Sequence, residues 1–322
     1  DYFHERREGI YMERKYLPWV ASLGTWTEYK DNKVNEKDIH PYANVGIVEA
    51  RGFDGNFSFR HKIDKVDLTI RGNMTYSKNE ILERDEENTI YWYKMQEGHR
   101  VDQAMGLVAL GLFKDYEEIR NWPKQFGDVM PGDIKYKDIN GDGVIDGDDK
   151  TYFGYARHPE YVFGFLGGFS WKNFEFSMQW TAAMNASRIL EGEYRNAFGS
   201  TNSRMLLKFL ADGRWTEENP CSRFPRLTFM NKTHYLEDTD LWLMNGSYLR
   251  LKTAEISYTF QNKDFLKKIG VESVRLYCNG YNLLTLFSDL NDIDIDPEGK
   301  TSGGDNTYPN VRIYNFGINV SF

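Results

Sequence analysis

Residues 138–149 form the stretch whose residue types and spacing most resemble a metal site. Their sequence, DINGDGVIDGDD, follows the calcium-loop pattern D-x-[DN]-x-[DN]-G-x₅-E, except that an aspartate stands in the last position. Calcium takes about six to eight oxygen ligands, mostly from carboxylates, amides and carbonyls. The expected ligands here are the side chains of Asp138, Asn140, Asp142, Asp146 and Asp149 and the backbone carbonyl of Val144.

The details of this loop favour a structural ion over a catalytic one. Gly143 permits the sharp turn in the middle of the loop, and Asp146 is expected to act through a water molecule. Asp149 has a shorter arm than the usual glutamate, which weakens bidentate binding or demands a tighter loop. Calcium is expected before magnesium, because Mg²⁺ keeps more of its waters. The alternative is an acidic turn closed by its own hydrogen bonds, without an ion.

Aromatic residues gather in the same part of the sequence and suggest a second kind of binding. Tyr91 and Trp92 stand together, and Trp215 lies further along the chain. Sugars stack on such rings, so these three residues are the expected ligand contacts. The alternative for each of them is packing of long loops against one another or against a partner.

No motif points to catalysis. The sequence has no G-x-S-x-G elbow, no H-E-x-x-H pair and no P-loop, and its six histidines show no ligand spacing. Carboxylates are plentiful, but nothing singles out a hydrolytic pair. The net charge of −8 argues against a nucleic-acid surface. The two cysteines, Cys221 and Cys278, are too few for a disulfide framework and are expected to be unpaired.

The elements that must position these residues are β-strands with two unlike faces. In the last twelve residues, 311–322, one face carries Tyr314, Phe316, Ile318, Val320 and Phe322. The same alternation predicts three hairpins, a weaker strand within residues 1–17 and a short helical turn at 264–269. With the last strand this makes eight strands. The predicted hairpins pair 53–60 with 66–76 across a turn at 61–64, 161–170 with 174–183, and 248–260 with 274–286.

Composition alone fits a membrane barrel and a soluble tyrosine-rich β-protein equally well, and the connections favour the barrel. Aromatic residues make up 16% of the chain while the mean hydropathy is only −0.64, as expected when alternate residues face lipid. No stretch approaches the roughly 18 apolar residues of a spanning helix. Short turns alternate with long links at 79–160, 185–247 and 287–310. Short turns at one end and long loops at the other are the layout of an outer-membrane barrel.

Several segments, taken together, resemble one known family. The segment 131–146, PGDIKYKDINGDGVID, is similar to a signature of the SusC/RagA family of TonB-dependent outer-membrane transporters, and further similarities follow in the family's order. The chain also ends on an aromatic residue, as outer-membrane barrels do. The other similar segments are residues 44–46 with 52–53, 171–174, 214–216 with 219–220, 224–227, 245–252 and 282–283.

The resemblance implies the C-terminal part of such a transporter. Residues 1–322 would then be barrel wall, with the plug domain and the segment that contacts TonB absent from this chain. Because these transporters have about 22 strands around a plugged lumen, eight strands need another polypeptide, expected to be the N-terminal part of the same protein. The alternative is a self-contained eight-stranded barrel filled by its own side chains, in which 311–322 pairs with the first strand. Candidate filling residues are Arg60, Arg71, Glu175 and Gln179.

The implied function is TonB-dependent import across the bacterial outer membrane. The implied cargo is a glycan or an oligopeptide, and the long loops would dock a SusD-like surface lipoprotein. A soluble calcium-containing β-sheet protein that binds glycans is the alternative from a different class. The sequence leaves open the cargo, the identity of the metal, the origin of the chain start at Asp1 and the oligomeric state.

Overall fold

The computed structural model contains one large antiparallel sheet and a set of small elements in its connections. The structure describes residues 1–15, 25–30, 33–38, 41–86, 89–198, 206–229, 237–261, 268, 270–299 and 310–322. The large sheet has eight strands in the order β1-β4-β5-β12-β13-β16-β17-β18. They are β1 (Tyr2–Glu13), β4 (Tyr42–Ile63), β5 (Val66–Glu83), β12 (Tyr161–Trp171), β13 (Phe174–Met184), β16 (Tyr248–Gln261), β17 (Ser273–Leu286) and β18 (Ile313–Ser321). The predicted antiparallel sheet of eight strands is confirmed.

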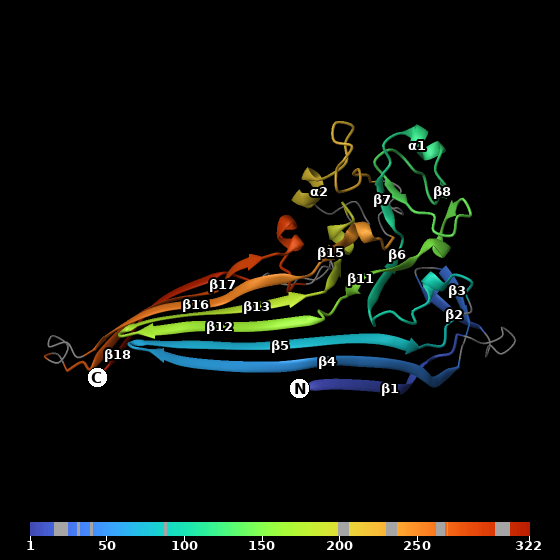
Figure 1. The fold of residues 1–322 in the computed structure, drawn as a ribbon. Helices are drawn as coiled ribbons and strands as arrows, with labels where there is room; N and C mark the ends of the chain where they lie inside the picture. Colours follow the sequence, from blue (N-terminus) through green and yellow to red (C-terminus); the bar gives the residue numbers. More distant parts are fainter. Residues whose placement is uncertain are drawn as a thin grey trace.

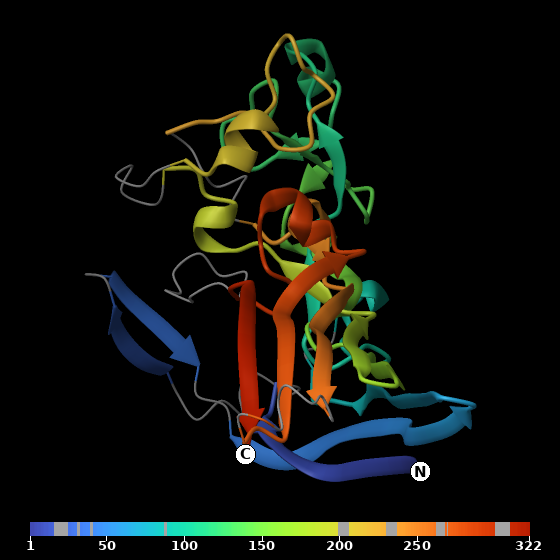
Figure 2. The ribbon, with the colours of Figure 1, turned by 90° about the vertical axis from the view of Figure 1, so that its left-hand side faces the viewer.

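The sheet does not close on itself. In the described part of the chain, β1 pairs only with β4 and β18 only with β17, so these two strands are opposite edges of the sheet. Figure 2 shows the sheet as a curved wall, with β1, β4 and β5 sweeping away from β16, β17 and β18. The self-contained barrel required β18 to pair with β1, which it does not do here.

The hairpin turns are shorter than the sequence predicted. Asp64 and Lys172 adopt positive φ angles of 53° and 55°, the backbone conformation that two-residue hairpin turns need. Pairing therefore continues as far as Ile63 with Val66, and Trp171 with Phe174. The predicted turn at 61–64 is thus wrong by three residues, because residues 61–63 extend β4. The helical turn expected at 264–269 lies almost wholly outside the described residues.

The long links gather at the end of the wall opposite the turns between β4 and β5 and between β12 and β13 (Figure 1). Between β1 and β4 lies the hairpin of β2 (Thr25–Lys30) and β3 (Lys33–Asp38). The third link contains η6 (Asp289–Ile293). The link before β12 contains η2 (Trp92–Lys94), β6 (Gln103–Gly106), β7 (Ala109–Leu112), α1 (Tyr116–Arg120), β8 (Lys124–Gln125), β9 (Ile134–Tyr136), β10 (Val144–Ile145), η3 (Gly147–Asp149) and β11 (Thr151–Ala156). The link before β16 contains β14 (Ser187–Ile189), η4 (Gly192–Tyr194), α2 (Lys208–Asp212), η5 (Asp240–Trp242) and β15 (Leu243–Asn245).

The hydrophobic core lies in these links, which we call the cap, and not against the large sheet. Trp242 and Leu190 are fully buried, whereas Phe316 in β18 is 81% exposed. No helix among the described residues is long and apolar enough to cross a membrane. The cap core consists of Leu107, Ile134, Tyr136, Ile145, Leu190, Leu210, Phe224, Trp242, Met244, Leu290, Ile293 and Ile295.

Candidate functional site

One face of the sheet carries continuous apolar rows, which we call the outer face. Because directly paired residues in adjacent strands point to the same side, strand register places distant residues in one row. The row nearest the short turns contains no charged side chain. It runs through Ile63, Val66, Trp171, Phe174, Tyr258, Leu276 and Ile318. The next row runs through His61, Leu68, Phe169, Phe176, Ile256, Cys278 and Phe316.

Aromatic residues border the apolar part of the outer face at the cap end and at the turn end of the strands. At the cap end, Phe53 is paired across the strands with Tyr76, and Tyr76 is paired with Tyr161. The ring centroids are 5.5 Å apart in the first pair and 4.6 Å apart in the second. Trp171 and Phe174 occupy the turn end. From Tyr161 to Trp171 the strand advances ten residues (171 − 161), or about 33 Å at ~3.3 Å per residue. At a strand tilt of about 40°, this corresponds to a band roughly 25 Å high, the height of the lipid-facing band of outer-membrane barrels.

The opposite, inner face is polar and internally connected. Arg275 in β17 pairs with Glu255 in β16 at 2.6 Å and with Glu175 in β13 at 3.6 Å. Asn279 donates to Glu255 at 3.1 Å, and Asn315 in β18 donates to Asn279 at 3.0 Å. This network links four neighbouring strands. Two unlike faces of this kind suit a wall between lipid and a watery lumen.

The acidic loop is closed by its own side chains. The two carboxylate oxygens of Asp138 accept from the backbone N–H groups of Gly141 and Gly143, at 2.6 and 2.9 Å. Asp142 accepts from Val144 at 2.8 Å. Gly143 has a φ of +85°, as the expected sharp turn requires.

Asp149, the last residue of the loop, closes the loop by hydrogen bonds to its backbone. It is fully buried, and its carboxylate accepts from the N–H groups of Ile139 at 2.7 Å and Asp146 at 3.0 Å. No group of three or more His, Cys, Asp or Glu side chains within the described ranges is arranged to hold a metal ion. The predicted ligand residues therefore lie together in one turn, and many of their oxygens accept hydrogen bonds from backbone N–H groups of that turn. The bound ion stays a prediction.

The short helix η2 clamps this loop. The hydroxyl of Tyr93 donates to the carbonyl of Asp148 at 2.8 Å, and Lys94 pairs with the Asp148 carboxylate at 2.6 Å. Burial, together with the nearby Asp149 carboxylate, raises the pKa of Tyr93 to about 12. Asn140 donates to the hydroxyl of Tyr91 at 3.4 Å. Trp92 is 79% exposed, so of the two predicted ligand contacts in this segment, Tyr91 touches the acidic loop and Trp92 faces outward.

Trp215 lies against a different part of the cap. A Cβ atom added to Gly132 would stand 2.5 Å from the Trp215 ring, so the ring packs directly on that glycine. Arg226 donates to the buried Asp133 carboxylate at 2.7 Å and from its backbone to the carbonyl of Gly132 at 2.9 Å. In the described ring contacts, Trp215 meets neither Tyr91 nor Trp92. Three of the segments that resemble the family, 131–146, 214–216 and 224–227, therefore pack together around Gly132.

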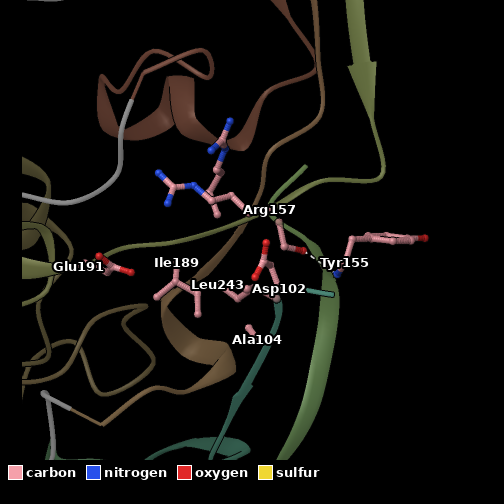
Figure 3. A pocket seen from close by; sticks show the side chains of 9 residues that line it. Asp102, Ala104, Tyr155, Arg157, Ile189, Glu191 and Leu243 are labelled. Carbon is pink, nitrogen blue, oxygen red and sulfur yellow. Dashed lines mark hydrogen bonds between the residues drawn. The ribbon is translucent and has the colours of Figure 1, made fainter. Parts of the chain in front are cut away.

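A small cavity, which we call the rim pocket, opens between β6–β11 and β14–β15 (Figure 3). Its volume is about 140 Å³. Gly154, with a φ of +66°, lets β14 approach closely, because an added Cβ would stand 2.7 Å from the Ser187 hydroxyl. The same hydroxyl accepts from the backbone N–H of Tyr155 at 2.8 Å. The lining residues are Asp102, Ala104, Tyr155, Arg157, Ser187, Arg188, Ile189, Glu191 and Leu243.

Two arginines make this pocket chemically distinctive. Burial and the nearby positive charge of Arg157 lower the pKa of the Arg188 guanidinium. The Nε atom of Arg188 is buried without a hydrogen-bond partner. Within the described ranges, neither arginine has a carboxylate within 4.0 Å. Nothing in the sequence pattern marks these residues, because the strands that bring them together belong to different links.

Comparison with known proteins identifies the family. No protein-family model matches the chain. It is 30% identical over 301 residues to the TonB-dependent receptor P26 of Formosa agariphila, covering 87% of the chain and 30% of that receptor. It is 22% identical over 290 residues to the TonB-dependent receptor SusC of Bacteroides thetaiotaomicron, covering 87% of the chain and 27% of SusC.

Solved structures share the fold. The RagAB peptide importer in its open-open state aligns with the whole chain at a TM-score of 0.66 and 19% identity, over 32% of the importer chain. The closed-closed state gives a TM-score of 0.64 at 20% identity. The chain thus spans about a third of the length of these relatives. Over that third, the chain belongs to the SusC/RagA family of TonB-dependent receptors.

Proposed function

We propose that residues 1–322 form the C-terminal part of the barrel wall of a TonB-dependent importer in the bacterial outer membrane. The observation that carries this proposal is the outer face, where uncharged rows run across seven strands between two aromatic borders. Lipid accepts such rows, whereas water would penalise them. The inner face, with its Arg275–Glu255 network, would line the lumen.

The two open edges define what the wall needs to be complete. In a bilayer every backbone polar group must find a partner within the protein, so only a closed barrel is stable there. β1 and β18 therefore require strands from outside residues 1–322. The proposed source is the N-terminal part of the same transporter, which would also supply the plug and the contact with TonB. Eight strands are just over a third of the ~22 strands of such barrels.

The cap is the proposed docking surface for a SusD-like lipoprotein. The links lie at the opposite end of the wall from the short turns, so the cap would face the cell exterior. Exposed apolar side chains on the cap, Ile90 at 87% and Trp92 at 79%, suit contact with a partner or with cargo. The proposed cargo is a glycan or an oligopeptide, with Tyr91, Trp92 and Trp215 as candidate contacts, and the chain has no catalytic role.

The complete transporter tests this proposal. Purified in detergent, it should migrate faster on gels when unheated than when heated, and it should carry a lipoprotein with it. Deletion of its gene should abolish growth on the imported nutrient, with growth restored by the intact gene. A protein that remains in the soluble fraction and migrates identically with and without heating would support the soluble glycan-binding alternative instead.

We also propose that the acidic loop binds a structural Ca²⁺ ion. The spacing of Asp138, Asn140 and Asp142 and the positive φ of Gly143 support it. Calcium should protect this loop from protease in the complete protein, and chelator should remove that protection. Asp142→Ala should abolish the calcium effect without unfolding the barrel, whereas Glu117→Ala, an exposed carboxylate on α1, should leave it intact. Equal cleavage of the loop with calcium and with chelator would contradict the calcium site and support the acidic turn without an ion.

A further inference from the structure

We propose that the rim pocket binds a carboxylate group, held between Arg157 and Arg188. The pocket is a defined cavity of about 140 Å³ with apolar walls from Ala104, Ile189 and Leu243. Both arginines line it. Glu191 lies at the opposite end of the pocket from Tyr155 (Figure 3).

The charges and the unsatisfied donor of the two arginines favour binding of an anion. Two positive charges side by side repel each other, and a partly buried guanidinium without a partner is costly. Arg188 shows both features, because its Nε is buried and unsatisfied and Arg157 is its charged neighbour. An oxyanion between the two side chains would relieve the repulsion and satisfy the donors. The planar fork of a guanidinium matches the two oxygens of a carboxylate.

The other charges of the pocket narrow the chemistry of the ligand. Asp102 and Glu191 also line the cavity, so its two positive charges are balanced by two negative ones. A dianion such as phosphate would gain from the arginines but be repelled by both carboxylates. A ligand with one carboxylate and nearby hydrogen-bond donors, hydroxyls or an ammonium group, would satisfy both sets. An acidic sugar residue and a zwitterionic peptide residue share this chemistry.

The position of the pocket places it at the mouth of the proposed lumen. β14 begins three residues after the end of β13, and β15 ends three residues before the start of β16. The pocket is therefore built directly on the cap end of the wall. As an account of the ligand's source, the inference rests on the proposed import function. As an account of binding, it stands on the geometry of the pocket alone.

Calorimetry on the complete transporter in detergent tests the inference. The probes are D-glucuronate, diglycine, inorganic phosphate and neutral glucose. Glucuronate or diglycine should bind to the wild type, and which of the two binds more tightly distinguishes a sugar source from a peptide source. Loss of hydrogen bonds to a charged group typically costs a factor of about ten or more. Arg157→Gln and Arg188→Gln should each weaken binding by about that factor, while Arg120→Gln on α1 should leave it unchanged.

A second measurement does not depend on variants folding. Phenylglyoxal should modify Arg157, which is exposed, and the bound probe should protect it, as read by mass spectrometry of the labelled peptide. The inference is overturned if neither carboxylate probe binds at millimolar concentration, if phosphate binds more tightly than both, or if the two glutamine variants bind as well as the wild type. A transporter that imports its nutrient normally and still binds no carboxylate refutes this inference and leaves the proposed function standing.

Discussion

At the scale of single residues, buried charges hold the cap together. Asp133 is fully buried and pairs with Arg226, which is 19% exposed at its side chain. Trp215 packs on the adjacent Gly132. A buried carboxylate that loses its cationic partner keeps the cost of desolvation, and the hydrogen bond that Asp133 accepts from the Met130 N–H offsets only part of it. The pair therefore joins two segments of the cap that are 93 residues apart in the chain.

Arg226→Ala should therefore loosen the cap locally. We expect a loss of about 3 kcal/mol in local stability, the low end for breaking a buried pair because Arg226 is partly exposed. Amide hydrogen exchange at residues 131–136 in the complete protein measures it. Lys208→Ala removes an exposed ion pair with Asp212 and should leave exchange unchanged. Equal exchange in both variants would mean that the Asp133 pair does not stabilise the cap.

The phenol of Tyr93 should make the acidic loop sensitive to alkali. Burial raises its pKa to about 12 from an ordinary value near 10. A group whose pKa is raised in the folded state contributes fully below its unfolded pKa, and that contribution is lost as the pH rises through the folded value. Protease cleavage of residues 138–149 should therefore increase between about pH 10 and 12. Tyr93→Phe cannot ionise and should lack this step; a step of equal size in the variant would assign it to another group.

At the scale of elements, the two faces of each strand differ in polarity and therefore in the surroundings that they suit. Directly paired residues repeat outward apolar rows from strand to strand, and the intervening residues form the inner polar network. Because side chains alternate with a period of two, a shift of one residue in register would place polar residues against lipid. The short turns at Asp64 and Lys172 set the register of their hairpins.

A charge on the outer face should therefore disrupt assembly, and one on the inner face should not. Phe165 lies on the outer face between the two aromatic borders, and Gln179 lies on the inner face of the adjacent strand. Phe165→Lys should cost about 2–4 kcal/mol, as for lysine near the middle of a bilayer. Gln179→Lys should fold normally. Folding into vesicles followed by heat-modifiable migration measures both, and normal assembly of Phe165→Lys would show that this face does not contact lipid.

At the scale of the whole molecule, the chain is a wall with two free edges. A sheet edge with unpaired N–H and C=O groups invites pairing with another chain, or aggregation. β1 and β18 are such edges in the described part of the chain, and no helix or loop strand pairs with them there. A complete transporter would pair both of them.

This predicts a difference in amide exchange between the complete transporter and residues 1–322 alone. In the complete protein, amides of β1 and β18 should be as protected as those of the central strand β13. In the isolated segment, the unpaired amides of both edge strands should exchange fast while β13 stays slower. Hydrogen exchange with mass spectrometry measures both samples. Fast exchange at β18 in the complete transporter would mean that the barrel does not close there.

The sequence by itself determined the strands, their two faces and the loop that resembles a calcium site. These features are local: alternation has a period of two residues, and the spacing from Asp138 to Asp149 is read within one turn. The same local signals located the hairpins but not where their strands end. β4 begins at Tyr42 and not at 53, β5 continues to Glu83 and not only to 76, and residues 61–63 belong to β4 and not to the turn, because nothing local shows where pairing stops.

Only the tertiary structure decided how distant residues meet. Asp133 and Arg226 are 93 residues apart in the chain, and Arg157 and Arg188 come from different connections. No periodicity links such pairs, because contacts of this kind depend on how whole links fold over one another. The open sheet order was decided in the same way, since strand alternation is identical whether or not the first and last strands of a sheet meet.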